Sequence, residues 1–442
     1  MDIQEFLPGV KHPIESGHPV ITPMHQEQAH REPRPDIFAN LDYDRAPFLA
    51  IWETTQACDL ACKHCRASAQ PLAHPSQLTT AEAKNLIDQI AELKVPLFVF
   101  TGGDPLKRPD IFELIRRAAE KGVHAALTPS ATPLLTRDAI FRMKESGLSR
   151  LAVSLDGSVP EIHDAIRGIP GTWERTLQAI EWANEANLPI QVHTVVSRLN
   201  ISDLDNLSVL LTQKQIVMWS FFFLVPVGRG KTADLLTGEE FEEVFAKMWE
   251  LTKRVPFAIK TTEAMHYRRY LIQQRLLEGR PTTGIHDDAG AAPTLPHGSR
   301  GWTGHPGTGS EAKAVGWATK RVNDGRGFVF ISHIGKVYPS GFLPIEGGDL
   351  HNETLAHIYQ ESPIFVKLRN SDLLHGKCGA CEFRNICGGS RARAYAVTGD
   401  VLAEEPCCIY QPRGYHPDPN AKNESSPGCE AHDLVQLEVA HS

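Results

Sequence analysis

The chain has 442 residues, and its 45 Lys and Arg against 53 Asp and Glu give a formal net charge of −8. This acidic balance argues against nucleic acid as a partner, because nucleic-acid binding needs a concentrated basic face. Hydrophobic residues make up 41% of the chain and charged residues 22%, which excludes a disordered or fibrous protein.

The first 45 residues are rich in Pro and His and predict an extended arm without regular structure. They contain no basic start followed by an apolar segment, which is the pattern of a secretory signal. The longest apolar run, residues 217–227, is too short to span a membrane. We therefore expect a cytoplasmic protein with no membrane partner, whose spaced cysteines bind metal or do chemistry rather than form disulfides.

Residues 46–278 alternate between short apolar runs and segments with helical periodicity. The predicted strands are 48–53, 97–101, 124–128, 150–155, 190–196 and 218–224. The predicted helices are 80–93, 110–121, 137–146, 173–185, 203–213 and 239–254, with a further helix over 262–278. Six such βα units predict an α/β fold with a parallel sheet, either open or curled into a barrel.

The rest of the chain divides into three segments by composition. Gly, Pro, His and Thr crowd residues 279–327, which is typical of an insertion or linker and fits a mobile surface segment or an active-site cover. Residues 328–412 form a small cysteine-bearing region with a predicted strand over 328–332. The last segment, 413–442, predicts a disordered tail.

Three cysteines follow the first predicted strand in the sequence CDLACKHC: Cys58, Cys62 and Cys65. A structural zinc site is one interpretation, but such a site usually needs four protein ligands and this loop offers three. Three thiolates suit a [4Fe–4S] cluster, whose fourth iron then stays open to a small molecule. Spacing and context favour the cluster over zinc.

CDLACKHC resembles the signature of the radical S-adenosylmethionine (SAM) superfamily, and the similarity extends over residues 48–410. The resemblance implies a partial (β/α)6 barrel of the TIM type whose first loop holds the cluster. It also implies an electron donor such as flavodoxin or ferredoxin, and reductive cleavage of SAM to a 5′-deoxyadenosyl radical that abstracts hydrogen from the substrate. His64 stands where the family often has an aromatic side chain beside the adenine, although a partly exposed loop histidine is an equal interpretation.

The motif Gly102-Gly103-Asp104-Pro105 directly follows the second predicted strand. By itself it could be a tight turn in which glycines allow close backbone approach. Its position one βα unit after the cysteines resembles the family's site for the SAM amine. Asp104 replaces the more common Glu, so we expect contact from the Gly102–Gly103 backbone more than from Asp104.

Further polar residues follow the third and fourth predicted strands. The resemblance places Ser130, Ser154, Asp156 and Arg167 in the SAM pocket, with turn capping or a surface ion pair as the alternative for each. Arg229, after the sixth strand, could meet a substrate carboxylate or face water. All these residues lie at the C-terminal ends of predicted strands, where α/β folds bind ligands.

A second group, Cys378, Cys381 and Cys387, has the spacing CxxCxxxxxC. It resembles the SPASM or shorter twitch extension of radical SAM enzymes, which carries auxiliary iron–sulfur clusters. The run CGACEFRNICGGSRARAYAVTGD resembles proteins of haem d1 and alternative haem biosynthesis, and a related family of unassigned substrate. A zinc ribbon is the alternative interpretation of these thiols.

Other residues limit how many auxiliary clusters the chain can hold. Ser340 and Ser390 stand where fuller SPASM patterns have Cys, which argues for one auxiliary cluster. Cys408 fits its fourth ligand better than Cys407, and Cys429 has no assigned task.

We expect the substrate to be a small molecule or a peptide. A tetrapyrrole would present propionates, for which Arg229, Arg391 and Arg393 are candidate partners. Residues 1–45 lack the pattern of a peptide-docking domain, which argues modestly against a peptide. A non-catalytic electron carrier or a zinc scaffold would need no SAM pocket, so the GGDP and VSLDG motifs argue against both.

Overall fold

The computed structural model describes residues 41–279 and 322–416. Most of the predicted arm, the 279–327 insertion and the predicted tail with Cys429 lie outside these ranges. Within them, no helix is long and apolar enough to cross a membrane.

Seven consecutive parallel strands form the centre of the molecule. They are β1 (Leu49–Glu53), β2 (Leu97–Thr101), β3 (Ala125–Leu127), β4 (Arg150–Ser154), β5 (Ile190–Val196), β6 (Met218–Phe223) and β7 (Ala258–Thr262). The first six match the predicted strands to within one residue at each end. β7 was not predicted, because residues 258–262 precede the helix that we placed over 262–278 and lack a strong alternating pattern.

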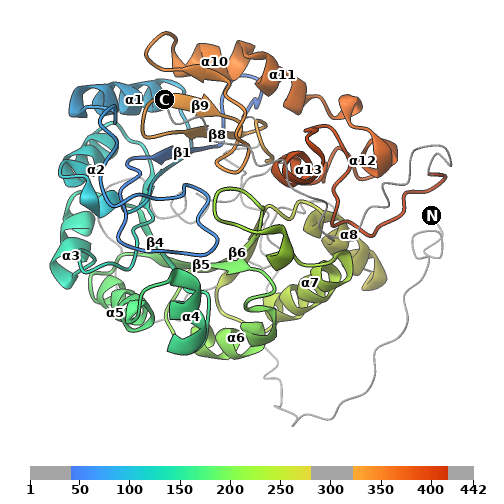
Figure 1. Cartoon of the computed structure of the whole chain (residues 1–442), viewed down its shortest axis with the longest axis horizontal. Helices are drawn as coiled ribbons and strands as arrows, with labels where there is room; N and C mark the ends of the chain where they lie inside the picture. The colour runs from blue at the N-terminus through green and yellow to red at the C-terminus, as the bar shows by residue number, and fades with distance from the viewer. Residues whose placement is uncertain (1–40, 280–321, 417–442) are drawn as a thin grey trace.

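Helices join successive strands and follow one another around the outside of the sheet (Figure 1). They are α1 (Thr80–Glu92), α2 (Ile111–Glu120), α3 (Arg137–Glu145), α4 (Pro160–Arg167), α5 (Thr172–Glu185), α6 (Leu204–Thr212), α7 (Gly238–Thr252) and α8 (Tyr267–Leu277). Capping boxes begin α1 at Thr79 and α7 at Thr237, as the N-cap rules predict. The short helix α4 was not predicted, and it proves central to the site.

The sheet continues beyond β1 with strands that come late in the sequence. β8 (Phe328–Ile331) pairs in parallel with β1, and β9 (Lys336–Tyr338) and β10 (Gly348–Asp349) follow in antiparallel order. The ten described strands run in the order β10-β9-β8-β1-β2-β3-β4-β5-β6-β7. The division of the chain into domains stays a prediction, but the region assigned to the C-terminal extension shares the sheet of the core.

Short helices complete the described C-terminal region: α10 (Leu355–Glu361), α11 (Pro363–Arg369), α12 (Gly376–Ala380) and α13 (Arg391–Thr398). In Figure 1 they occupy the arc between α8 and α1. Large aromatic side chains, among them Trp52, Phe100 and Trp219, are fully buried in the main core. This core fixes the strands, whose C-terminal ends carry the loops described next.

Candidate active site

The loop that carries Cys58, Cys62 and Cys65 leaves the end of β1 and is held by two neighbouring loops. Ala61 N donates to Arg167 O over 3.1 Å, at the end of α4, and Arg229 N donates to Cys65 O over 3.0 Å. Gly168 has φ +76°, and a Cβ there would lie 2.7 Å from the Ala61 carbonyl oxygen. These backbone contacts therefore fix the path of the cysteine loop.

Each of the three cysteine sulfurs accepts a polar contact from the protein. Leu60 N lies 3.4 Å from Cys58 Sγ, Ala69 N lies 3.5 Å from Cys65 Sγ, and Arg167 Nη1 lies 3.9 Å from Cys62 Sγ. Ser130 Oγ also lies 3.4 Å from Cys58 Sγ. N–H contacts to sulfur and a nearby cation stabilise thiolate ligands, so this donor set fits an iron–sulfur cluster.

Asp156 and Arg167 form a buried ion pair beside Cys62. Arg167 Nη2 lies 2.6 Å from Asp156 Oδ2, and Val195 N donates to Asp156 Oδ1 over 2.8 Å. Burial alone would raise the pKa of Asp156, but Arg167 and His64 outweigh it and hold that pKa below its usual value. His64 Nε2 lies 3.8 Å from Asp156 Oδ2, and burial lowers the pKa of His64 to about 4. The structure thus brings these three predicted residues together.

The GGDP motif packs against the stem of the cysteine loop. Gly103 N donates to Thr55 O over 2.8 Å and Asp104 N donates to Ala57 O over 2.6 Å. A Cβ on Gly102 would lie 2.6 Å from the Thr55 carbonyl oxygen, so close backbone approach explains the glycine there. Pro105 begins a short 3-10 helix, Pro105–Lys107.

Asp104 is completely buried, and both of its carboxylate oxygens have partners. Leu106 N donates to Oδ1 over 3.1 Å, and Thr132 Oγ1 donates to Oδ2 over 2.6 Å. Burial raises the pKa of Asp104. These contacts favour Asp104 as an organiser of the loops after β2 and β3 rather than as a direct ligand contact.

The two predicted serines differ in their surroundings. Ser130 Oγ donates to Gly103 O over 2.7 Å while it contacts Cys58 Sγ, so it joins the GGDP turn to the cysteine loop. Ser154 ends β4 and pairs in register with His193 of β5. Its role in SAM binding stays a prediction.

An ion-pair network that we did not predict ties the cysteine loop to β8. Glu53 Oε2 lies 3.0 Å from Arg66 Nη1, and Glu53 Oε1 lies 2.7 Å from His333 Nδ1. The Arg66 guanidinium also stacks 4.3 Å from the ring centroid of Phe330. The position of Arg66 directly after Cys65 could have marked it as a residue of the site. Its network could not be found from the sequence, because Glu53 and His333 are 280 residues apart in the chain.

The second group of cysteines lines one small chamber: Cys378, Cys381, Cys387 and Cys408. Here too the backbone donates to sulfur, because Phe383 N lies 3.4 Å from Cys381 Sγ and Gly389 N lies 3.4 Å from Cys387 Sγ. These contacts have the same two-residue spacing as Leu60 N to Cys58 Sγ. The chamber therefore offers four thiols in the environment of cluster ligands.

Cys408, not Cys407, is the thiol at the chamber. Cys407 lies in the hydrophobic core and its sulfur is engaged in a disulfide bond, whereas the seven cysteines of the two groups are free thiols. Cys408 is a free thiol, and burial raises its pKa to about 12. The geometry agrees with the preference for Cys408 as the fourth thiol.

Among the described residues, no three His, Cys, Asp or Glu side chains are placed so that they could hold one metal ion. Tetrahedral zinc needs its ligands about 2.3 Å from one point, whereas the thiolates of a cubane bind separate irons. The choice of clusters over zinc at these thiols therefore rests on the sequence patterns and stays a prediction.

The structure corrects the assignment of Arg391 and Arg393 to a substrate carboxylate. Arg391 Nη1 donates to Val401 O over 3.0 Å and Arg391 Nη2 lies 3.8 Å from Cys378 Sγ. Arg393 is fully buried and its Nη1 lies 3.0 Å from Glu405 Oε1. Arg393 also donates to the backbone carbonyls of Leu224 and Glu263 in the core. Both guanidiniums are thus occupied inside the protein and are not available to substrate.

Arg229 differs from these two arginines. Its Nε and Nη2 are buried, and they have no hydrogen-bond partner within the described parts of the chain. Its backbone contacts Cys65, which places it beside the first cysteine loop.

The two serines that replace cysteines of fuller SPASM patterns meet at one carboxyl group. Ser390 Oγ donates to Glu263 Oε2 and Ser340 Oγ donates to Glu263 Oε1 over 3.5 Å. Burial raises the pKa of Glu263 well above its usual value, and the nearby Asp324 raises it further. The carboxyl group of Glu263, which directly follows β7, thus joins the core to two serines of the extension.

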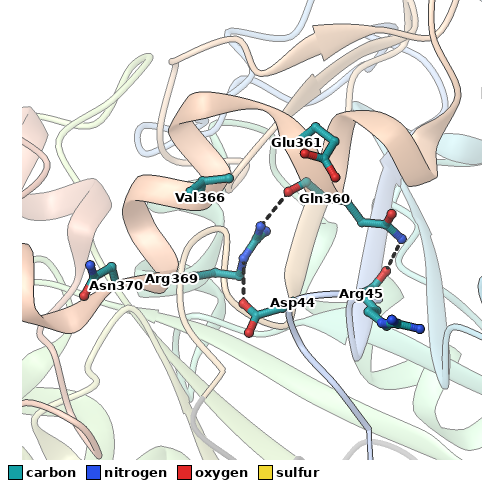
Figure 2. Close-up of a pocket in the computed structure, with 7 residues that line it drawn as sticks. All are labelled: Asp44, Arg45, Gln360, Glu361, Val366, Arg369 and Asn370. Atoms are coloured by element: carbon teal, nitrogen blue, oxygen red, sulfur yellow. Dashed lines mark hydrogen bonds and ion pairs between the residues drawn. The ribbon is translucent and has the colours of Figure 1, made fainter.

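A pocket at the molecular surface shares no residue with either cysteine site (Figure 2). It lies where residues 44–45 are fastened to α10 and α11, because Arg369 Nε lies 2.9 Å from Asp44 Oδ1 and Gln360 Nε2 donates to Arg45 O over 2.9 Å. We assign it no chemistry.

Comparison with known proteins agrees with this site. Residues 52–211 match the Radical SAM superfamily, and an "AdoMet-dependent heme synthase" from Methanosarcina barkeri is 37% identical over 367 residues, 83% of this chain and 97% of that protein. The chain therefore belongs to the radical SAM superfamily, whose members are enzymes that use a [4Fe–4S] cluster and SAM.

More distant relatives show the breadth of this superfamily. A "PqqA peptide cyclase" from Bradyrhizobium diazoefficiens is 27% identical over 375 residues, 83% of this chain and 87% of that protein. The structure of Streptococcus suis SuiB bound to S-adenosylmethionine superposes with a TM-score of 0.59 at 13% identity, covering 83% of this chain and 78% of that one. The likeness to SuiB confirms the α/β fold expected from the sequence.

Proposed function

We propose that the enzyme cleaves SAM at a cluster held by Cys58, Cys62 and Cys65 and abstracts hydrogen from a tetrapyrrole side chain. The observation that carries the SAM chemistry is the set of contacts to these three sulfurs from Leu60, Ala69 and Arg167. When bound, the cluster would supply the electron that splits the SAM sulfonium. The 37% identity to a heme synthase along 97% of its length supports the substrate class.

The protein's own residues have separate tasks in this proposal. Arg167 places a positive charge beside Cys62 and offsets the charge of the thiolate, and Asp156 fixes the guanidinium in that position. Ser130 joins Cys58 to the GGDP turn. We assign the SAM contacts to His64, Ser154 and the backbone at Gly102 and Gly103.

Arg229 is the proposed partner of a substrate propionate. Its unpartnered guanidinium nitrogens can meet a carboxylate bidentately, beside the loop at which the radical would form. Loss of one hydrogen atom and then of carbon dioxide from a propionate leaves a vinyl group and one electron. We propose that Cys378, Cys381, Cys387 and Cys408 would hold an auxiliary cluster, which would supply the acceptor for this electron, and that a flavodoxin or ferredoxin would supply the first one.

The test uses anaerobically reconstituted full-length enzyme with SAM and a low-potential reductant. We expect 5′-deoxyadenosine, and mass spectrometry of added iron-coproporphyrin should show loss of carbon dioxide together with hydrogen. A reduced enzyme that makes no 5′-deoxyadenosine refutes the SAM chemistry. Enzyme that makes 5′-deoxyadenosine but modifies added peptides, and never the porphyrin, refutes the tetrapyrrole and supports the peptide alternative.

A further inference from the structure

His266 is a buried histidine in the chamber of the second cysteine group. It precedes α8, is 1% exposed, and lines the same cavity as the four cysteines. Its ring packs against Phe241 and Phe245, whose ring centroids lie 5.0 and 4.9 Å away. This packing fixes the imidazole against the apolar side of the chamber.

Both ring nitrogens of His266 are buried, and neither has a hydrogen-bond partner within the described ranges of the chain. A neutral imidazole always carries one N–H donor, and leaving such a group unpaired inside a protein costs about 1–3 kcal/mol. Because the unpaired N–H of His266 faces a cavity, we expect the group that fills this cavity to supply the missing acceptor.

The neighbouring polar groups of the chamber already have other partners. Glu405 accepts from Arg393 Nη1 over 3.0 Å and from Ser390 N over 2.7 Å. Arg269 pairs with Glu242. Lys377 Nζ donates to Cys408 O over 2.8 Å. Arg269 and Lys377 can only donate, and Glu405 is already held by two donors, so the acceptors that remain for His266 are the thiolates and what they bind.

We propose that His266 donates its ring N–H to a sulfur of the auxiliary cluster and thereby raises the reduction potential of that cluster. This inference rests on the auxiliary cluster of the proposed function. Four thiols already serve four irons, so the imidazole is a hydrogen-bond donor and not a fifth ligand. Donation to cluster sulfur stabilises the more negative, reduced state, which suits a cluster that must accept an electron.

The first experiment isolates the auxiliary cluster in full-length protein carrying Cys58→Ala, Cys62→Ala and Cys65→Ala. Its midpoint potential is measured by a titration followed by electron paramagnetic resonance. We expect His266→Phe to shift the potential downward at unchanged iron content, and His266→Gln, which keeps an N–H donor, to restore part of the shift. The control is His375→Phe, because His375 is 57% exposed, pairs with Asp400 and lies outside the chamber lining.

A second measurement keeps the proposal testable if His266→Phe loses iron. Histidine labelled with ¹⁵N should give a weak hyperfine coupling to the reduced cluster, and this coupling should vanish in His266→Gln. An unchanged potential in His266→Phe, the absence of the coupling, or a coupling as strong as that of an iron-bound nitrogen overturns the proposal. If Cys378→Ala leaves the iron content of this background unchanged, the auxiliary cluster itself is refuted instead.

Discussion

The two cysteine sites differ in how the chain delivers their thiols. The first takes three thiols from one loop of eight residues, Cys58 to Cys65, and surrounds them with polar groups from the loop after β3 and the end of α4. The second gathers four thiols from residues 378–408 around one chamber, where burial raises the pKa of three of them to about 12. A three-thiol site leaves room for a reactant, whereas four desolvated thiols enclose what they bind. We therefore expect the first site to cleave SAM and the second to transfer electrons.

The largest effect should come from the first site. Cys62→Ala removes a thiol of the three-thiol loop, and we expect 5′-deoxyadenosine formation to fall to background, as measured by chromatography after anaerobic reduction. Cys378→Ala is the matched control because it removes one thiol from the other site. Retained SAM cleavage in Cys62→Ala would contradict the division of tasks between the sites.

Removal of a chamber thiol should uncouple the two sites. Reconstituted enzyme should hold about eight irons if both cubes form, and Cys381→Ala should hold about four. SAM cleavage should persist. Turnover of substrate should be lost, because the electron released together with carbon dioxide has no acceptor. An iron content near eight in Cys381→Ala would argue that this thiol binds no cluster.

The buried ion pair at the first site should matter more than an exposed one. Arg167→Gln leaves Asp156 buried without its cation, and we expect a loss of about 3–5 kcal/mol in the free energy of unfolding by urea. Arg137→Gln breaks the exposed pair with Glu185 and should cost less than about 1 kcal/mol. Equal losses in the two variants would show that Asp156 does not depend on Arg167.

Acid should lower the free energy of unfolding by a smaller amount, through buried histidines near the first site. Burial lowers the pKa of His163 to about 4 and that of His193 to about 3, below the ordinary value of about 6.5. The unfolded chain therefore binds more protons below about pH 6.5, so stability falls as the pH falls, by about 1 kcal/mol per pH unit for each histidine. Urea unfolding of wild type and His193→Gln at pH 7 and pH 5 measures this, and the variant should lose less stability. An equal loss in both proteins would assign the acid sensitivity elsewhere.

The sequence by itself determined the local features of this protein. Six strands with alternating or apolar patterns, the three thiols of CDLACKHC and the GGDP turn could be located because each depends on residues within about ten positions. The thiols of the second group could be named for the same reason, and the choice of Cys408 came from the resemblance.

Only the tertiary structure decided which distant residues share a site. It pairs β8 with β1 and joins Glu53 and Arg66 to His333, although these segments lie far apart in the chain. It also places His266, whose ring nitrogens have no partner among the described residues, in the chamber of the second cysteine group. The same folding buried Arg391 and Arg393, which the sequence alone presented as free cations. A side chain's partners depend on packing between elements, and no local pattern records that packing.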